Sequence, residues 1–127
     1  MYPIQFHADE LAWQDSGIAG VRFKILDGNP AERASVVLYR FEPGSVVAQH
    51  LHTGADELAY VLEGAFIEDE RIYGAGAVFA APAGSGHGPH RTDSGCTVMF
   101  VLSAALDFVA LPCATTGSDT QATMTGG

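Results

Sequence analysis

Two histidines, His50 and His52, stand one residue apart in the stretch GSVVAQHLHTGADELAYVLEG, residues 44–64. The apolar residues around them predict a strand, and residues i and i+2 of a strand point to the same face of a sheet. Two neutral imidazoles placed in this way can both reach one metal ion. Glu57 follows across a TGAD turn and opens the next predicted strand, which antiparallel pairing would bring back beside the first. The three side chains are therefore candidate ligands of a single metal ion.

The histidine spacing alone leaves a second interpretation open, because such a pair on a strand edge is more often exposed or hydrogen-bonded than bound to a metal. A longer pattern favours the metal. Its first part has the spacing G-x5-H-x-H-x4-E-x6-G and comprises Gly44, His50, His52, Glu57 and Gly64. Its second part has the spacing G-x5-P-x-G-x2-H and comprises Gly76, Pro82, Gly84 and His87.

These two motifs resemble, at every ligand position, the two sequence motifs of the cupin superfamily, and the resemblance covers about residues 19–110. It implies an all-β fold, the double-stranded β-helix or cupin jelly-roll barrel, as a single domain. It also implies one divalent metal ion at the mouth of that barrel. The cupin motif has an Asn four residues after its last ligand, where this chain has Arg91, but that Asn is not a ligand. The ligands implied by the resemblance are His50, His52, Glu57 and His87.

A narrower resemblance, to the cupin domain of ChrR-type anti-sigma factors, rests on four short elements. They are VLEG (residues 61–64), a Tyr and Gly turn (73–76), PAGSGHGP (82–89) and Gly95 with Cys96. That subfamily commonly has Glu-Glu where this chain has Asp56 and Glu57, so Asp56 stays open as the ligand, although the six-residue count to Gly64 favours Glu57. We do not expect the sigma-binding domain of such factors here, because only about twenty residues precede the first predicted strand, with no CxxC and no helical run.

His90 lies three residues beyond His87. Because an imidazole titrates near neutral pH, His90 could act as a catalytic proton carrier at the mouth of the barrel. The alternative is an exposed loop residue. The implied ligand set accepts Fe, Mn, Zn or Ni and does not choose among them. Residues an even number of positions from the ligands on the same predicted strands would point to the same side and line an apolar pocket. They are Val46, Ala48, Ala59 and Val61.

Two functions of different classes follow from the resemblance. Cupins with similar HxHTG and PxGSxH strings include iron-dependent dioxygenases that cleave carbon–carbon bonds in small diketones or acetophenones. The first hypothesis is therefore a divalent-metal-dependent enzyme, such as an iron(II) dioxygenase acting on a small carbonyl compound. The second is a non-catalytic metal-binding sensor module of the ChrR type. An enzyme needs an open metal face with room for a substrate, whereas a sensing site can be closed by packed side chains.

Length and charge narrow the partners further. A chain of 127 residues is long enough for one domain with a real core. A formal net charge of −9 would repel a phosphate backbone, so we expect no nucleic-acid partner. No apolar stretch has the length of a membrane helix, and the N-terminal residues lack the features of a secretory signal. We therefore expect no membrane partner and a cytoplasmic location.

The elements that must position the site are predicted strands, which recur every eight to twelve residues between turn residues. Two of them, LAYVL (residues 58–62) and TVMFVL (97–102), are apolar on both faces. They would lie either between two layers of the fold or under a partner subunit, which is a reason to expect a homodimer. We predict a cupin barrel over residues 19–112 and a disordered tail over residues 113–127. Residues 1–18 would form an N-terminal extension that could serve as a dimer arm.

Overall fold

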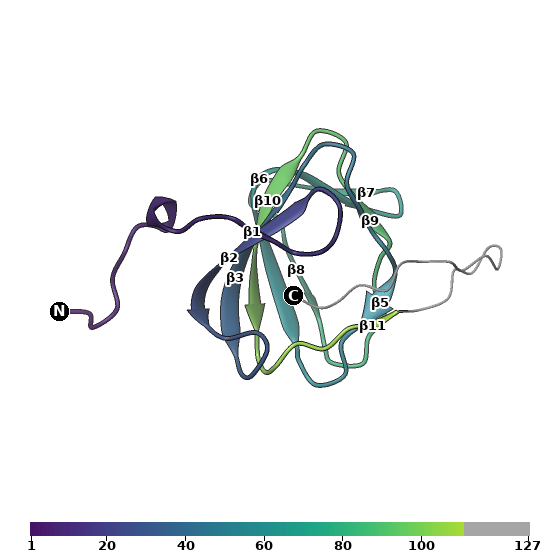
Figure 1. Ribbon diagram of the computed structural model, residues 1–127. Helices are drawn as coiled ribbons and strands as arrows, with labels where there is room; N and C mark the ends of the chain where they lie inside the picture. Colours follow the sequence, from purple (N-terminus) through teal and green to yellow (C-terminus); the bar gives the residue numbers. More distant parts are fainter. Residues whose placement is uncertain (111–127) are drawn as a thin grey trace.

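The computed structural model describes residues 1–110, which form strands and one short 3₁₀ helix (Figure 1). The predicted tail, residues 113–127, lies outside the described residues. No helix within residues 1–110 combines the length and the apolar character needed to cross a membrane. The elements are η1 (Ala8–Glu10), β1 (Gln14–Asp15), β2 (Val21–Gly28), β3 (Ser35–Phe41), β4 (Val46–Val47), β5 (His50–Leu51), β6 (Glu57–Glu68), β7 (Arg71–Gly74), β8 (Val78–Ala81), β9 (His90–Arg91), β10 (Cys96–Leu102) and β11 (Val109–Ala110).

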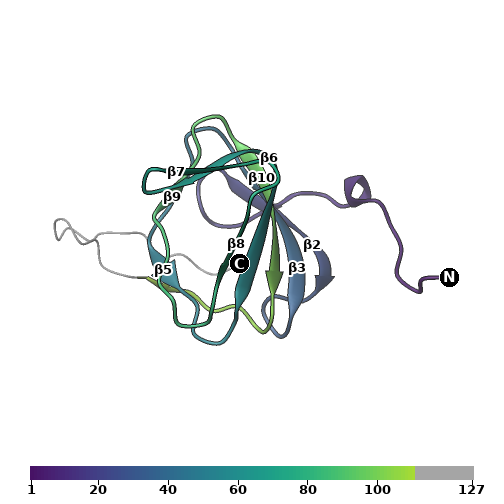
Figure 2. The same ribbon diagram turned by 180° about the vertical axis from the view of Figure 1, so that it is seen from behind.

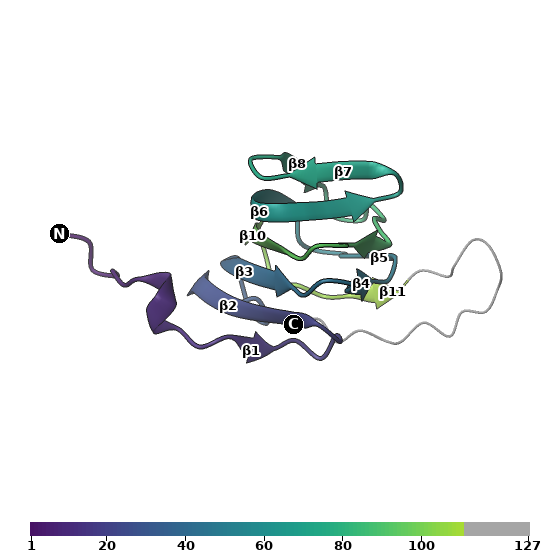
Figure 3. The same cartoon turned by 90° about the horizontal axis from the view of Figure 1, so that it is seen from above.

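Most strands belong to one antiparallel sheet that curls around a common core. Its order is β1-β2-β3-β10-β6-β9-β4, with β7 and β8 also paired to β6 (Figure 3). The strand β6 pairs with β8 through residues 57–60 and with β7 through residues 65–68, so it belongs to both walls of the curl. The short pair β5–β11 lies across the open side (Figures 1 and 2). The predicted all-β, single-domain jelly-roll fold is confirmed.

Alternation along β6 separates the inside of the barrel from the outside. Ala59 and Val61 are fully buried, whereas Leu58, Tyr60 and Leu62 between and beside them are 40–44% exposed. This is the period-two pattern of a sheet with one face on the core. The inner face is filled by Val37 of β3, Val98 of β10 and a group of aromatic rings, Tyr39, Phe41, Phe66 and Phe100.

The last glycine of the first motif, Gly64, allows a close approach of two chain segments. Its φ is 77°, a left-handed conformation that favours glycine. A Cβ at this position would overlap the carbonyl oxygen of Gly95 and the Cα of Cys96. The glycine therefore lets β6 cross tightly over the turn that leads into β10. Cys96 is buried in the core at 1% exposure, as expected for a small core residue.

The N-terminal extension is joined to the barrel at two places. β1 pairs with β2, with Gln14 opposite Phe23. Lys24 of β2 is only 6% exposed. Its Nζ donates a hydrogen bond to the carbonyl oxygen of Ala8, at 2.9 Å, and lies 4.5 Å from the centre of the Trp13 ring. The N-terminal segment therefore covers Lys24 on β2.

Candidate metal centre

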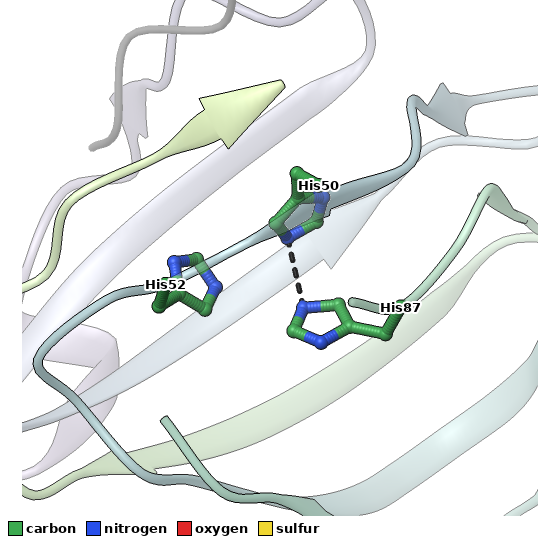
Figure 4. A group of neighbouring side chains, drawn as sticks. All are labelled: His50, His52 and His87. Atoms are coloured by element: carbon green, nitrogen blue, oxygen red, sulfur yellow. Dashed lines mark hydrogen bonds between the residues drawn. The ribbon is translucent and has the colours of Figure 1, made fainter. Parts of the chain in front are cut away.

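The three predicted ligand histidines lie on two backbone segments that face each other. His50 is the first residue of β5, and His52 follows that strand. His50 and His87 exchange two backbone hydrogen bonds, each 2.9 Å long. Figure 4 shows the three imidazole rings turned toward one another from these two segments. Glu57 is the first residue of β6 and is held opposite Leu102 of β10.

The ligand atoms of these side chains converge. One nitrogen from each of the three imidazoles lies within 4.8 Å of the other two. The Nε2 atoms of His50 and His87 are 3.0 Å apart. The Glu57 carboxylate completes the cluster, with 3.2 Å from Oε1 to His52 Nε2 and 3.8 Å from Oε2 to His87 Nε2. Asp56, the alternative carboxylate, is exposed and accepts a hydrogen bond from the Ala83 amide, so the structure places Glu57 beside the imidazoles.

Backbone carbonyls fix the tautomers of two imidazoles. His50 Nδ1 donates to the carbonyl oxygen of Ala48 at 2.8 Å, and His52 Nδ1 donates to that of Asp107. Because a carbonyl only accepts, each Nδ1 carries the hydrogen and each Nε2 presents a lone pair to the cluster. His87 Nδ1 is buried and has no hydrogen-bond partner among the described residues. A donor set of three imidazoles and one carboxylate arranged in this way fits a divalent metal ion.

Three of the four groups, His50, His87 and Glu57, are held in the protonation states that a metal requires. Burial, reinforced by the neighbouring imidazoles, lowers the pKa of His50 to about 3, and burial also lowers the pKa of His87. Burial would lower the pKa of His52 too, but the hydrogen bonds with Glu57 and with the Asp107 carbonyl outweigh it and raise that pKa. For Glu57, the effect of burial is outweighed by the imidazoles, His52 first, which lower the pKa of its carboxyl. A neutral His50 and an ionised Glu57 are both competent ligands.

An apolar pocket opens onto this cluster. Its walls are mainly aromatic and aliphatic side chains, namely Ile18, Tyr39, Phe41, Val47, Phe66, Phe100, Leu102, Leu106 and Phe108. The predicted pocket walls were largely wrong. Val46 is 58% exposed, and its neighbour Val47 lines the pocket, because the alternation breaks at residues 48–49 between β4 and β5. Ala59 and Val61 face inward as predicted but are fully buried in the core.

The sequence model of the ChrR cupin-like domain matches residues 2–106. The chain belongs to this cupin family. Among curated proteins, none matches the sequence. The solved structure of KdgF from a Halomonas species is 31% identical, with a TM-score of 0.68, and the match covers 77% of this chain and 92% of that one.

Two further solved structures share the fold of this cupin. An RmlC-like cupin from Shewanella frigidimarina is 23% identical, with a TM-score of 0.70 and coverage of 83% of this chain and 93% of that one. An acetylacetone dioxygenase from Acinetobacter johnsonii is 13% identical, with a TM-score of 0.67 and coverage of 99% of this chain and 85% of that one. At these identities the likeness concerns the fold.

His90 of this cupin is not an exposed loop residue. It lies on β9, is 5% exposed and lines the pocket. Its ring stacks on Phe66, with centroids 4.6 Å apart, and stands 5.6 Å from the ring of His87. His90 Nε2 lies 3.5 Å from Oε1 of Glu68. Burial lowers the pKa of His90, and the charge of Glu68 only partly offsets this. The imidazole is therefore a second, non-ligating titratable group beside the cluster.

Sequence reasoning missed the segment Leu106–Phe108, which we call the strap. The Phe108 ring stacks on His50, with centroids 4.0 Å apart and planes at 23°, and its edge meets His52. The Asp107 carboxylate accepts hydrogen bonds from the Thr53 amide, at 2.8 Å, and from the Thr53 hydroxyl. The only sequence signal is an aromatic residue in an apolar run after β10, which is too short a pattern to be assigned.

Proposed function

We propose that this cupin is a divalent-metal-dependent dioxygenase, with iron(II) as its metal, that acts on a small carbonyl compound. The observation that carries the proposal is the convergence of His50, His52, Glu57 and His87 at one wall of an apolar, largely aromatic pocket. A divalent iron held there would supply a Lewis acid for a carbonyl oxygen and a redox centre for dioxygen. In such a reaction both atoms of dioxygen enter the two products of carbon–carbon cleavage.

The pocket walls would bind and orient the substrate. Aromatic side chains exclude water and favour a small, weakly polar molecule. Tyr39 lines the pocket and offers it a phenol hydroxyl. Burial, with a contribution from the charge of Glu57, raises the pKa of Tyr39 to about 12. The phenol therefore stays protonated and can donate a hydrogen bond to a carbonyl oxygen of the substrate.

His90 would handle a proton in this reaction. A carbonyl compound loses a proton from the carbon beside its carbonyl group when it is activated, and a base near the metal must accept that proton. The imidazole of His90 is buried at the pocket wall, and its Nε2 lies 3.5 Å from Glu68. A proton taken up by His90 would be stabilised by the Glu68 carboxylate.

Oxygen uptake tests the proposal. The protein would be purified without metal-affinity steps, its metals measured by plasma mass spectrometry, and the iron(II)-loaded protein mixed with short diketones and acetophenones in an oxygen electrode. An acetylacetone dioxygenase shares the fold, so 2,4-pentanedione is the first compound to try. We expect one equivalent of oxygen consumed per equivalent of diketone, and no uptake by His52→Ala. Iron bound at one per chain without uptake on any compound would contradict the proposal.

A metal sensor module is the second candidate. It is favoured by the match to the ChrR cupin-like domain and by Phe108, which covers His50 from the C-terminal side. A sensor would bind its metal with no turnover of any carbonyl compound. Zinc at one per chain, bound with a large rise in thermal stability and without oxygen uptake after exchange for iron, would favour this candidate over the enzyme.

A further inference from the structure

The pocket extends from the ligand cluster along the inside of the barrel. Leu102 of β10 lies opposite the ligand Glu57. At the other end of β10, Cys96 lies opposite Phe41, which in turn lies opposite Val21. The strand covers about 20 Å between Leu102 and Cys96. The pocket is also lined by four residues of that other end, which we call the far end, namely Ser16, Ile18, Val21 and Phe41. A substrate that meets the ligands with one end would therefore lie with its remainder toward the far end.

A row of aromatic rings leads from the ligands to the far end. The ring centroids of His87 and His90 are 5.6 Å apart, and His90 stacks on Phe66 at 4.6 Å. Phe66 contacts Phe41 of the far end, with centroids 5.1 Å apart. Beyond the ligand His87, only His90 in this row could carry a positive charge. A proton on His90 would already be balanced by Glu68, whose Oε1 lies 3.5 Å from His90 Nε2. The row therefore offers hydrocarbon surface and no spare positive charge.

The hydroxyl of Ser16 is the one polar side-chain group of the far end. It donates a hydrogen bond to the carbonyl oxygen of Val21, at 2.6 Å, and accepts one from the Ile18 amide, at 3.1 Å. Because its single hydrogen is already used, the far end has no side-chain hydrogen bond to donate to a bound molecule. An anionic group placed there would lose its hydration without any replacement.

The basic residues of the chain all lie away from this pocket. The sequence holds 6 Lys and Arg residues, every one of them within residues 1–110, and none of them lines the pocket. Three are paired with neighbouring carboxylates, namely Arg33 with Glu32, Arg40 with Glu63 and Arg91 with Asp93. The others are Lys24, which the Ala8 carbonyl holds, and the exposed Arg22 and Arg71. When the histidines are occupied as ligands, the positive charge left in the pocket is that of the divalent metal, and the Glu57 carboxylate balances one unit of it.

We propose that the substrate carries at most one negative charge, at the atoms that meet the metal, and that the rest of the molecule is uncharged and apolar. The remaining positive charge of the metal balances one anionic group. A second carboxylate or a phosphate group, lying toward the far end, would be buried without a counter-ion or a donor. Dicarboxylates and phosphorylated compounds are thereby excluded, and diketones with alkyl or aryl ends fit. This inference rests on the proposed function, because it concerns the substrate of the same pocket.

Calorimetric titration of the zinc-loaded full chain tests the proposal without turnover, because zinc has no redox chemistry. The two probes are 2,4-heptanedione and 4,6-dioxoheptanoate, which differ only in whether the remote carbon is a methyl group or a carboxylate. We expect the carboxylate to bind at least about thirtyfold more weakly. Ile18→Arg places a cation at the far end and should recover at least about tenfold of that affinity. Ile72→Arg is the matched control, since it adds the same charge at a residue of β7 that is 69% exposed and outside the pocket. Circular dichroism would verify that each variant is folded.

The outcomes separate this inference from the proposed function. Equal affinities of the wild type for the two probes would overturn the inference and leave the proposed function standing. A folded Ile18→Arg variant that gains no more affinity for the carboxylate than Ile72→Arg would overturn the placement of the substrate's remote part at the far end. A preference for 2,4-heptanedione without oxygen uptake by the iron-loaded protein would support the inference and contradict the dioxygenase. Binding of neither probe would overturn both.

Discussion

Each imidazole of the cluster is oriented by a contact outside the cluster, except His87. His50 and His52 have their Nδ1 atoms held by carbonyls, which leaves both Nε2 atoms free to ligate. Within residues 1–110, His87 Nδ1 has no such partner, and the position of His87 rests on its backbone pairing with His50. The ligand positions are therefore fixed mainly by backbone groups that substitutions of side chains leave in place.

We predict that His52→Ala and His87→Ala each abolish tight metal binding and leave the barrel folded. The core aromatic and aliphatic cluster lies beside the ligands and does not include them. Plasma mass spectrometry of the purified variants would measure the metal, and circular dichroism with thermal melting would measure the fold. Loss of the strand signal or of a cooperative melting transition would show that the cluster is part of the structural core.

The buried imidazoles also make the stability of the metal-free protein depend on pH. The pKa of His50 is about 3 in the folded chain and has its ordinary value near 6.5 in the unfolded chain. Between these values the unfolded state holds more protons, so the free energy of unfolding falls as the pH falls. The lowered pKa values of His87 and His90 act in the same direction, and the raised pKa of His52 opposes them.

We therefore predict that the chelator-treated protein loses stability from about pH 7 to about pH 5, by at most about 1.4 kcal/mol per pH unit for each such histidine. Urea denaturation at several pH values would measure this loss. His50→Gln should show a shallower pH dependence than the wild type. A stability that is constant or rises toward pH 5 would contradict the assignment of a neutral, buried His50.

At the scale of elements, the strap connects the C-terminal part of the described chain to the candidate metal ligands His50 and His52. Asp107 accepts hydrogen bonds from Thr53 with its carboxylate and from His52 with its backbone carbonyl. The strap is therefore joined to two adjacent residues, one of which is a candidate ligand. Interactions that orient a ligand in this way typically change metal affinity by 10–100-fold. The carboxylate of Asp107 is a positioning group and does not face the cluster.

We predict that Asp107→Ala raises the metal dissociation constant about tenfold and leaves the thermal unfolding of the metal-free protein nearly unchanged. Thr53→Val should have a similar effect, since it removes the hydroxyl that the carboxylate binds. Competition with a chromogenic chelator would measure the affinity. Asp93→Ala is the matched control, because Asp93 is an exposed carboxylate that pairs with Arg91 outside the cluster. Equal affinities for Asp107→Ala and the control would show that the strap does not position His52.

The candidate metal ligands could be predicted from the two sequence motifs, whereas the contacts that distant segments make with them could not. His50, His52, Glu57 and His87 have characteristic spacings, so their convergence could be predicted from the chain alone. The strap could not, because Phe108 reaches His50 across 58 residues of chain without a motif of its own. The pocket residues predicted from strand alternation were wrong between β4 and β5, because residues 48–49 belong to neither strand. These are tertiary effects that periodicity does not encode.

At the scale of the whole molecule, charge opposes the homodimer that the sequence predicts. Each copy carries a net charge of −9, so two copies repel one another until they meet through an uncharged surface, such as that of the exposed Leu58, Tyr60 and Leu62 of β6. Salt screens this repulsion and leaves apolar contacts intact. We predict that the dimer tightens as sodium chloride is raised, which sedimentation equilibrium at low and high salt would measure. A dimer that weakens with salt would indicate an interface held by ion pairs.

The position of β10 in the sheet bears on how the chain folds as it is synthesised. β10 lies between β3 and β6, although it follows both of them by at least 28 residues in the sequence. A ribosome-bound chain that ends before residue 96 therefore exposes the facing edges of β3 and β6, which are templates for pairing with other chains. Glu57 acquires its partner Leu102 only when β10 is added, and His52 acquires its partner Asp107 five residues later. Folding of the nascent chain thus ends with the addition of β10 and the strap, and the candidate metal cluster is complete only once both are in place.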